Sequence, residues 1–206
     1  AALPAAAAAA GLARMQANLD AAFARIRGLL ERRRASGFVR ECHGDLHCGN
    51  VTRWNDRLLA FDGLEFDPAL RFIDVANDLA FLSMDLAARG RPDLRRALLD
   101  AWCEASGDYD AIRTLPYFEG YRALVRAKVS ALRALQHGVD AHAAGSAVHR
   151  YLDWERRHAS RPPPLLVVMT GLSGSGKTWL ARRIAATCLA LHVRSDVERK
   201  RLAGLA

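Results

Sequence analysis

The sequence has little lysine, no disulfide spacing and no long apolar run. Only three of its 30 basic residues are lysines: Lys128, Lys177 and Lys200. Its four cysteines are scattered, which favours a reducing compartment, so we expect a cytoplasmic protein. No apolar run approaches the roughly 20 residues that cross a bilayer, and the alanine tract 5–10 lacks the basic residues of a signal peptide. We therefore expect no membrane partner.

The composition is that of an ordinary globular protein. The chain has 206 residues, of which 51% are hydrophobic and 25% are charged, which excludes collagen-like, mucin-like and wholly disordered classes. Its length suggests one domain or two small ones. The formal net charge is +8, but no basic patch interleaved with aromatic residues is present. The pattern therefore does not favour nucleic acid as a partner, and a GC-rich genome would give the same excess of arginine.

Apolar residues at intervals of three or four predict that the first part of the chain is helical. The predicted helices cover residues 11–34, 74–89, 92–106, 116–138 and 146–158. Ser36-Gly37 closes the first helix, and Pro92 and Gly107 suit the ends of the third. Two strand-like pieces, 50–54 and 58–62, flank Asn55-Asp56, a plausible hairpin turn.

Residues 160–164, Ser-Arg-Pro-Pro-Pro, predict a stiff linker. After them the sequence pattern changes from successive helices to alternating strands and helices. A strand (165–170), a glycine-rich loop, a helix (177–189), a second strand (190–194) and the start of a helix follow. We therefore expect two units, residues 1–159 and residues 165–206. The chain begins without Met and stops in mid-pattern, so we expect a piece of a longer protein.

The first chemical motif is the segment His-Gly-Asp-Leu-His-Cys-Gly-Asn, residues 43–50, with Phe61-Asp62-Gly63 at the end of the next strand. Phosphoryl transfer from ATP needs a carboxylate beside the acceptor hydroxyl and oxygen ligands for Mg²⁺. Asp45 can orient or deprotonate the hydroxyl. Asn50 and Asp62 are candidate Mg²⁺ ligands, because a hairpin would bring them together.

This segment resembles the catalytic loop of the aminoglycoside phosphotransferase and choline-kinase-like group, within the protein-kinase-like fold. Asp62-Gly63 is similar to the metal-binding Asp-Phe-Gly element, and Asp67-Pro68 and Asp78-Leu79-Ala80 are similar to a further stretch of the group. The resemblance implies a structural role for Asp74 or Asp78. Gly44 stands where regulated protein kinases carry arginine, which implies a small-molecule kinase.

The resemblance covers the helical lobe of that fold only, because residues 1–42 contain no lysine and no glycine-rich loop. For His43 a structural hydrogen-bonding role is favoured over a proton shuttle, and for His47 both stay open. A His-Gly-Asp tripeptide alone is often a turn. A zinc set of Cys42, His43, His47 and Cys48 matches no standard spacing.

The second motif, residues 171–178, reads Gly-Leu-Ser-Gly-Ser-Gly-Lys-Thr and fits the phosphate-binding loop Gly-x-x-x-x-Gly-Lys-[Ser/Thr] fully. Its predicted position between a strand and a helix is the context that the motif requires. Backbone N–H groups and Lys177 would bind phosphates, and the Thr178 hydroxyl would ligate Mg²⁺. The predicted nucleotide-binding residues are Gly171, Ser173, Gly174, Ser175, Gly176, Lys177 and Thr178.

Ser195-Asp196-x-x-Arg199 resembles the corresponding stretch of small P-loop kinases and of polynucleotide- or zeta-toxin-type kinases. This resemblance implies that Asp196 contacts the acceptor hydroxyl. The alternative is that Ser195 or Asp196 only caps the helix that follows.

The order of the two motifs is similar to that of bacterial proteins that join an aminoglycoside phosphotransferase-like domain to a C-terminal P-loop domain of the AAA family ATPase type. It implies a mostly helical α/β protein and an ATP- and Mg²⁺-dependent kinase acting on a hydroxyl of a small molecule. The alternatives are a nucleotide-binding regulatory ATPase and a toxin-like or nucleic-acid-end kinase. The 206-residue piece by itself is expected to be inactive.

Overall fold

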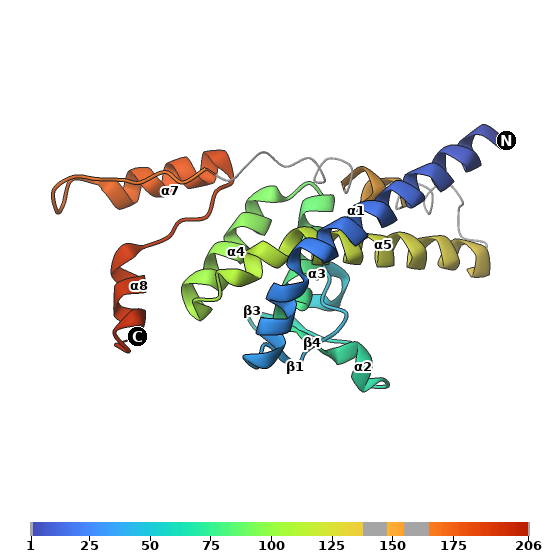
Figure 1. Ribbon diagram of the computed structural model, residues 1–206, viewed down its shortest axis with the longest axis horizontal. Coiled ribbons are helices and arrows are strands. Elements are labelled where there is room, and N and C mark those ends of the chain that lie inside the picture. Colours follow the sequence, from blue (N-terminus) through green and yellow to red (C-terminus); the bar gives the residue numbers. More distant parts are fainter. Residues whose placement is uncertain (1, 138–147, 155–164, 206) are drawn as a thin grey trace.

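The computed structural model describes residues 2–137, 148–154 and 165–205, and it is mostly helical with two small sheets (Figure 1). Its helices are α1 (Ala2–Ala35), α2 (Pro68–Arg71), α3 (Val75–Ala88), α4 (Pro92–Ser106), α5 (Asp110–His137), α7 (Lys177–Cys188) and α8 (Ser195–Leu202), and residues 148–154 are also helical. The predicted linker 160–164 and the two ends of the predicted helix 146–158 lie outside the described residues.

The two sheets are antiparallel pairs of short strands. Strand β1 (Val39–Glu41) pairs with β4 (Phe72–Asp74), and β2 (Val51–Trp54) pairs with β3 (Arg57–Ala60). The second pair is the predicted hairpin, whose turn residues Asn55 and Asp56 have φ values of 46° and 59°. The first pair was not predicted, because three-residue strands carry almost no sequence pattern.

Most helix boundaries agree with the sequence pattern. Helix α4 spans Pro92–Ser106, and Gly107 ends it with φ of 71°. Helix α1 starts well before residue 11, since an alanine tract has the highest helix propensity. Helix α5 begins at Asp110 and contains Pro116, which the sequence had suggested as its start. A proline there removes one backbone hydrogen bond without ending the helix.

Helix α3 lies at the centre of the molecule and separates two apolar clusters. It packs against α4 and α5, and α1 packs against α5. One cluster joins α1, α3, α5 and the helical residues 148–154: Met15, Leu19, Phe81, Met84, Ala123, Ala127, Tyr151 and Trp154. The other joins α3, α4 and α5: Ala76, Leu79, Ala80, Leu99, Ala111, Leu115 and Phe118. Helix α3 therefore contributes residues to both apolar clusters.

Arg33 fastens the end of α1 to this frame. Gly37, with φ of 76°, allows the chain to leave the helix, and the Phe38 N–H donates to the Arg33 carbonyl at 3.0 Å. The buried Arg33 guanidinium donates to Asp74 at 2.8 Å and to Asp108 at 2.6 Å. Burial disfavours its charge, but the two carboxylates outweigh burial and raise the pKa of Arg33. One side chain thus joins α1, β4 and the turn before α5.

Residues 165–205 form no strand, although the sequence predicts strands at 165–170 and 190–194. Leu165 and Leu166 are 87% and 84% exposed. A strand that is apolar on both faces needs neighbours and a covering layer, and the described residues supply neither. The chain runs out to the glycine-rich loop and returns as α7, and α8 follows a second extended segment (Figure 1).

The segment that leads into α8 contacts the α4–α5 region. The His192 N–H donates to Asp100 at 2.7 Å, and the Tyr109 hydroxyl donates to Glu198 at 2.8 Å. Leu191 packs against the second apolar cluster. These contacts join the C-terminal residues to the helical part.

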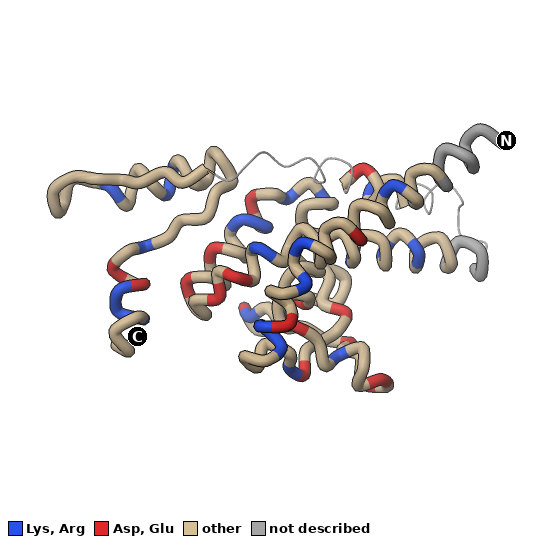
Figure 2. The backbone as a smooth tube through the Cα atoms, viewed as in Figure 1, with Lys and Arg blue, Asp and Glu red and all other residues tan. Residues whose placement is uncertain are grey.

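Charged residues of both signs are interspersed over the helices, and no single element gathers the basic ones (Figure 2). Among the helices of the described residues, none is both long enough and apolar enough to cross a membrane.

Candidate active site and phosphate-binding loop

The first loop, residues 43–50, lies between β1 and β2 and rests on one face of α3. The Asp78 carboxylate accepts the backbone N–H groups of His43 at 2.6 Å and of Gly44 at 3.0 Å. The Asp85 carboxylate accepts the N–H of Cys48 at 3.0 Å. Residues seven apart lie on the same helix face, so two aspartates of α3 hold the two halves of the loop.

Asp74 and Asp78, which the sequence left as alternatives, have different structural roles. Asp74 caps α3 by accepting the Ala76 N–H at 2.9 Å and also pairs with Arg33. Of these two residues, only Asp78 accepts hydrogen bonds from the first loop. Burial is the dominant influence on Asp78 and raises the pKa of its carboxyl group.

His43 joins the first loop to the segment after the hairpin. Its Nδ1 accepts the Asp45 N–H at 3.3 Å, which leaves Nε2 to donate to the Phe61 carbonyl at 2.8 Å. Its own carbonyl accepts the Leu64 N–H at 2.9 Å. Both ring nitrogens are thus used in holding the backbone together.

Asp45, Asn50 and Asp62 lie together at the open end of the hairpin. The Asn50 side-chain amide donates to the Asp45 carboxylate at 3.2 Å and to the Asp62 carbonyl at 3.5 Å. The Phe61 N–H donates to the Asn50 carbonyl at 3.0 Å, which extends the β2–β3 ladder by one pair. Asp62 then has φ of 61°, a left-handed conformation that ends the strand. The structure therefore places the Asn50 side chain between the Asp45 carboxylate and the backbone of Asp62.

Asp45 is held in its ionised form. Burial pushes its pKa up, but His47 and the positive charges of Arg126 and Arg122 outweigh burial, so the pKa of Asp45 is lowered. The His47 Nε2 lies 3.4 Å from Asp45 Oδ2, and the Asp45 side chain keeps 35% of its surface exposed. A carboxylate of lowered pKa is a good hydrogen-bond acceptor and a weak base. This environment suits orientation of a hydroxyl better than early removal of its proton.

Asn50 and the exposed Asp62 carry amide and carboxylate oxygens. Such hard oxygen ligands fit Mg²⁺. The zinc alternative gains no support. Burial raises the pKa of both Cys42 and Cys48 to about 11. Within the described ranges, no group of three or more His, Cys, Asp or Glu side chains could hold a metal ion.

Two supporting residues near the loop were missed by the sequence analysis. Arg122 is buried, donates to the Asn77 side chain at 2.7 Å and lies 4.6 Å above the Phe81 ring. Asp85 is fully buried. Its only sequence signal is its spacing from Asp78, seven residues along a predicted helix. Arg122 has no such signal, because it comes from a helix distant in the chain.

The glycine-rich loop turns at three glycines that have positive φ values. Gly171, Gly174 and Gly176 have φ values of 142°, 79° and 80°. Helix α7 begins directly after Gly176, so its first free N–H groups adjoin the loop. The Lys177 ammonium folds back over the loop and donates to the Gly171 carbonyl at 2.8 Å. Of the residues from 171 to 178, all but Lys177 are exposed, including Ser173, Ser175 and Thr178.

Asp196 is exposed and lies in the first turn of α8, where it pairs with Arg194 at 3.0 Å. The N-cap position is Arg194, whose side chain makes no capping hydrogen bond. Although desolvation opposes it, Arg194 and the backbone N–H groups of Asp196 and Val197 lower the pKa of Asp196. The capping alternative therefore stays a prediction. The predicted place of Asp196 beside the glycine-rich loop depended on parallel strands, and residues 165–205 do not form them.

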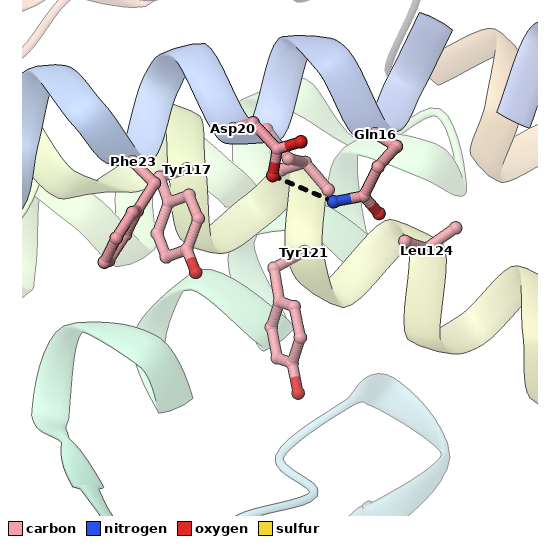
Figure 3. A pocket seen from close by; sticks show the side chains of 7 residues that line it. Gln16, Asp20, Phe23, Tyr117, Tyr121 and Leu124 are labelled. Carbon is pink, nitrogen blue, oxygen red and sulfur yellow. Dashed lines mark hydrogen bonds between the residues drawn. The ribbon is translucent and has the colours of Figure 1, made fainter. Parts of the chain in front are cut away.

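A separate groove of about 290 Å³ lies between α1 and α5 (Figure 3). Its walls include Phe23, Tyr117 and Tyr121, and the Gln16 side chain donates to Asp20 at its edge at 2.9 Å. None of the predicted site residues lines it. The groove is therefore distinct from both loops.

Comparison with known proteins identifies the class of the C-terminal part. Residues 166–206 match a family described as an AAA domain, which supports a P-loop nucleotide-binding domain at this end. An uncharacterized protein of Mycobacterium bovis and two of Mycobacterium tuberculosis are each 34% identical over 166 residues, or 81% of this chain. The chain spans about a third of the length of these relatives, 33%. No solved structure matches.

Proposed function

We propose that the protein containing this chain is an ATP- and Mg²⁺-dependent phosphotransferase that acts on a hydroxyl group of a small molecule. The first loop and the hairpin would form the transfer site, as in the aminoglycoside phosphotransferase-like group. Residues 171–178 would bind a nucleotide in a second unit. The observation that carries the proposal is the contact of the Asn50 side chain with the Asp45 carboxylate and with the backbone carbonyl of Asp62 at the end of the hairpin.

In this proposal the residues of the first loop and Asp62 have different roles. Asp45 accepts a hydrogen bond from the acceptor hydroxyl and turns its oxygen toward the γ-phosphate. As the new O–P bond forms and ADP leaves, the hydroxyl proton passes to the Asp45 carboxylate. Asn50 and Asp62 would hold Mg²⁺, which supplies charge neutralisation at the phosphates when bound. His47 keeps Asp45 ionised and oriented.

The P-loop unit is proposed to bind ATP through the backbone of residues 171–176 and through Lys177, with Thr178 toward Mg²⁺. Asp196 is proposed to meet a hydroxyl acceptor of this unit. The exposure of the Asp196 carboxylate at the start of α8 supports this proposal, because an acceptor can reach it. Its pairing with Arg194 would have to open to admit the acceptor.

The test is Asp45→Asn in the intact protein, with ADP release followed in Mg·ATP and a pool of small alcohols and sugars. We expect turnover to fall about a hundredfold or more, with nucleotide affinity unchanged, because the amide cannot accept the proton. Asp56→Asn is the matched control, since Asp56 lies in the exposed hairpin turn and pairs only with Arg53 in that turn. Unchanged acceptor-dependent turnover in Asp45→Asn would reject the transfer site.

A second function, a regulatory ATPase, is favoured by the contacts between the α8 segment and the α4–α5 region. Through these contacts, nucleotide at the glycine-rich loop could act on the helical part. In that case Asp45→Asn would leave ADP release unchanged, and Lys177→Ala would abolish it.

A further inference from the structure

Asp85 is a buried carboxylate that three donors approach from different parts of the chain. The Cys48 N–H lies 3.0 Å from it, the Arg89 Nε 3.0 Å, and the Tyr151 hydroxyl 2.8 Å. The Asp85 side chain is fully buried. A buried carboxylate is costly unless charge and hydrogen bonds compensate it, and this one is compensated.

Of the three donors, the Cys48 N–H connects Asp85 to the candidate active site. Cys48 begins the short 3-10 helix Cys48–Asn50, which ends on the buried Asn50. Within this turn the Asn50 N–H donates to the His47 carbonyl at 2.9 Å. The position of the Asn50 side chain therefore follows the position of the turn, and the turn is tied to α3 through Asp85.

The Tyr151 hydroxyl contacts the carboxylate oxygen of Asp85 that Cys48 does not use. Tyr151 comes from the helical residues 148–154, and it donates to Asp85 Oδ1, while Cys48 uses Oδ2. The Arg126 Nε lies 3.4 Å from the same hydroxyl, and Arg126 is one of the charges that lower the pKa of Asp45. Oδ1 thus accepts from Tyr151, and Oδ2 accepts from Cys48 and Arg89.

We propose that Asp85 is a positioning residue of the candidate active site: it fixes the turn that carries Asn50, and Tyr151 fixes Asp85. This inference rests on the proposed transfer function at Asp45, Asn50 and Asp62. It adds residues of α3 and of the helix after α5 to that site. A carboxylate suits this place because both of its oxygens accept hydrogen bonds and its charge pairs with Arg89, whereas an amide keeps one acceptor oxygen and loses the charge.

The experiment compares Asp85→Asn, Tyr151→Phe and the control Asp93→Asn in the intact protein. Asp93 is an exposed carboxylate paired with Arg91, so the control makes the same change of charge away from the loop. Hydrogen exchange of the Cys48 amide measures the tie without any activity. ADP release from Mg·ATP with the same pool of small alcohols and sugars measures kcat and the KM for ATP.

We expect Asp85→Asn to speed exchange at Cys48 by about tenfold to a hundredfold, the loss expected for a hydrogen bond to a charged group. It should lower kcat at least tenfold with little change in the KM for ATP. Tyr151→Phe should act in the same direction and more weakly, and it decides the question if Asp85→Asn does not fold. Asp93→Asn should change neither quantity.

If the Cys48 amide exchanges at an unchanged rate in Asp85→Asn and Tyr151→Phe, Asp85 does not hold the turn and the proposal is wrong. Faster exchange with unchanged kcat, in a protein that Asp45→Asn inactivates, would show that Asp85 holds the loop but does not position the site. If Asp45→Asn itself is silent, the proposed function fails, and the positioning role fails with it although the exchange result still stands.

Discussion

The two loops of this protein are built in opposite ways. The first loop is held from outside, by Asp78 and Asp85 of α3 and by backbone contacts to residues 61–64. The glycine-rich loop is exposed and is held by its own residues, with Lys177 donating to the Gly171 carbonyl. Tertiary structure therefore defines the first site, and local backbone conformation defines the second. Changes distant in the chain should damage the first loop and spare the second.

The largest expected effect, on the free energy of unfolding, comes from removing the Arg33 side chain, which joins α1 to Asp74 and Asp108. Arg33→Met would leave Asp74 and Asp108 buried without their cation, which should destabilise the helical part by about 3–5 kcal/mol. Arg27→Met removes an exposed pair with Glu31 and should cost less than about 0.5 kcal/mol. Urea unfolding followed by hydrogen exchange of α3 amides measures both. Equal effects of the two variants, or faster exchange at residues 171–178 in Arg33→Met, would break the comparison.

The next effect concerns the glycine-rich loop alone. Lys177→Ala removes the ammonium that the loop offers to phosphates, and Mg·ATP affinity of this unit should fall roughly a hundredfold, the worth of about two charge-assisted hydrogen bonds. Lys200→Ala, at an exposed position of α8, should leave affinity unchanged. Equilibrium titration with a fluorescent ATP analogue gives the result. Equal affinities of the two variants would contradict a phosphate role for Lys177.

A smaller effect distinguishes two glycines of similar conformation. Gly44 has φ of 81° and Gly174 has φ of 79°. A Cβ at Gly44 would lie 2.9 Å from the Leu70 carbonyl, whereas a Cβ at Gly174 meets nothing within 4 Å. Alanine should cost about 1–2 kcal/mol of left-handed strain at both positions, and Gly44→Ala should cost more because of the clash. Thermal unfolding of each variant measures the difference, and a larger cost at Gly174 would contradict the contrast between a packed and an open loop.

The same contrast explains what could be predicted from the sequence. The glycine-rich loop and its helix were predicted from consecutive residues, and the structure has α7 starting at Lys177 as predicted. The hairpin was also predicted, because its Asn-Asp turn and its strands are local. Asp85, Arg122 and the β1–β4 pair were missed, since their partners are distant in sequence and only packing brings them together.

The prediction of strands at 165–170 and 190–194 was wrong for the reverse reason. Their apolar pattern describes strands inside a sheet, and a sheet depends on neighbours that the described residues do not provide. The roles of Asp45, Asn50, Asp62 and Asp196 stay predictions, because position alone does not establish chemistry.

A double-variant cycle tests most directly the central claim that the two loops are separate sites. ADP release would be measured for the intact protein, Asp45→Asn, Lys177→Ala and the double variant, under identical Mg·ATP and the same acceptor pool. Separate sites predict that each change removes its own share of ADP release and that the free-energy effects add to within about 0.5 kcal/mol wherever both contribute. A double variant no worse than either single variant would show that both loops serve one coupled reaction, and would contradict the account.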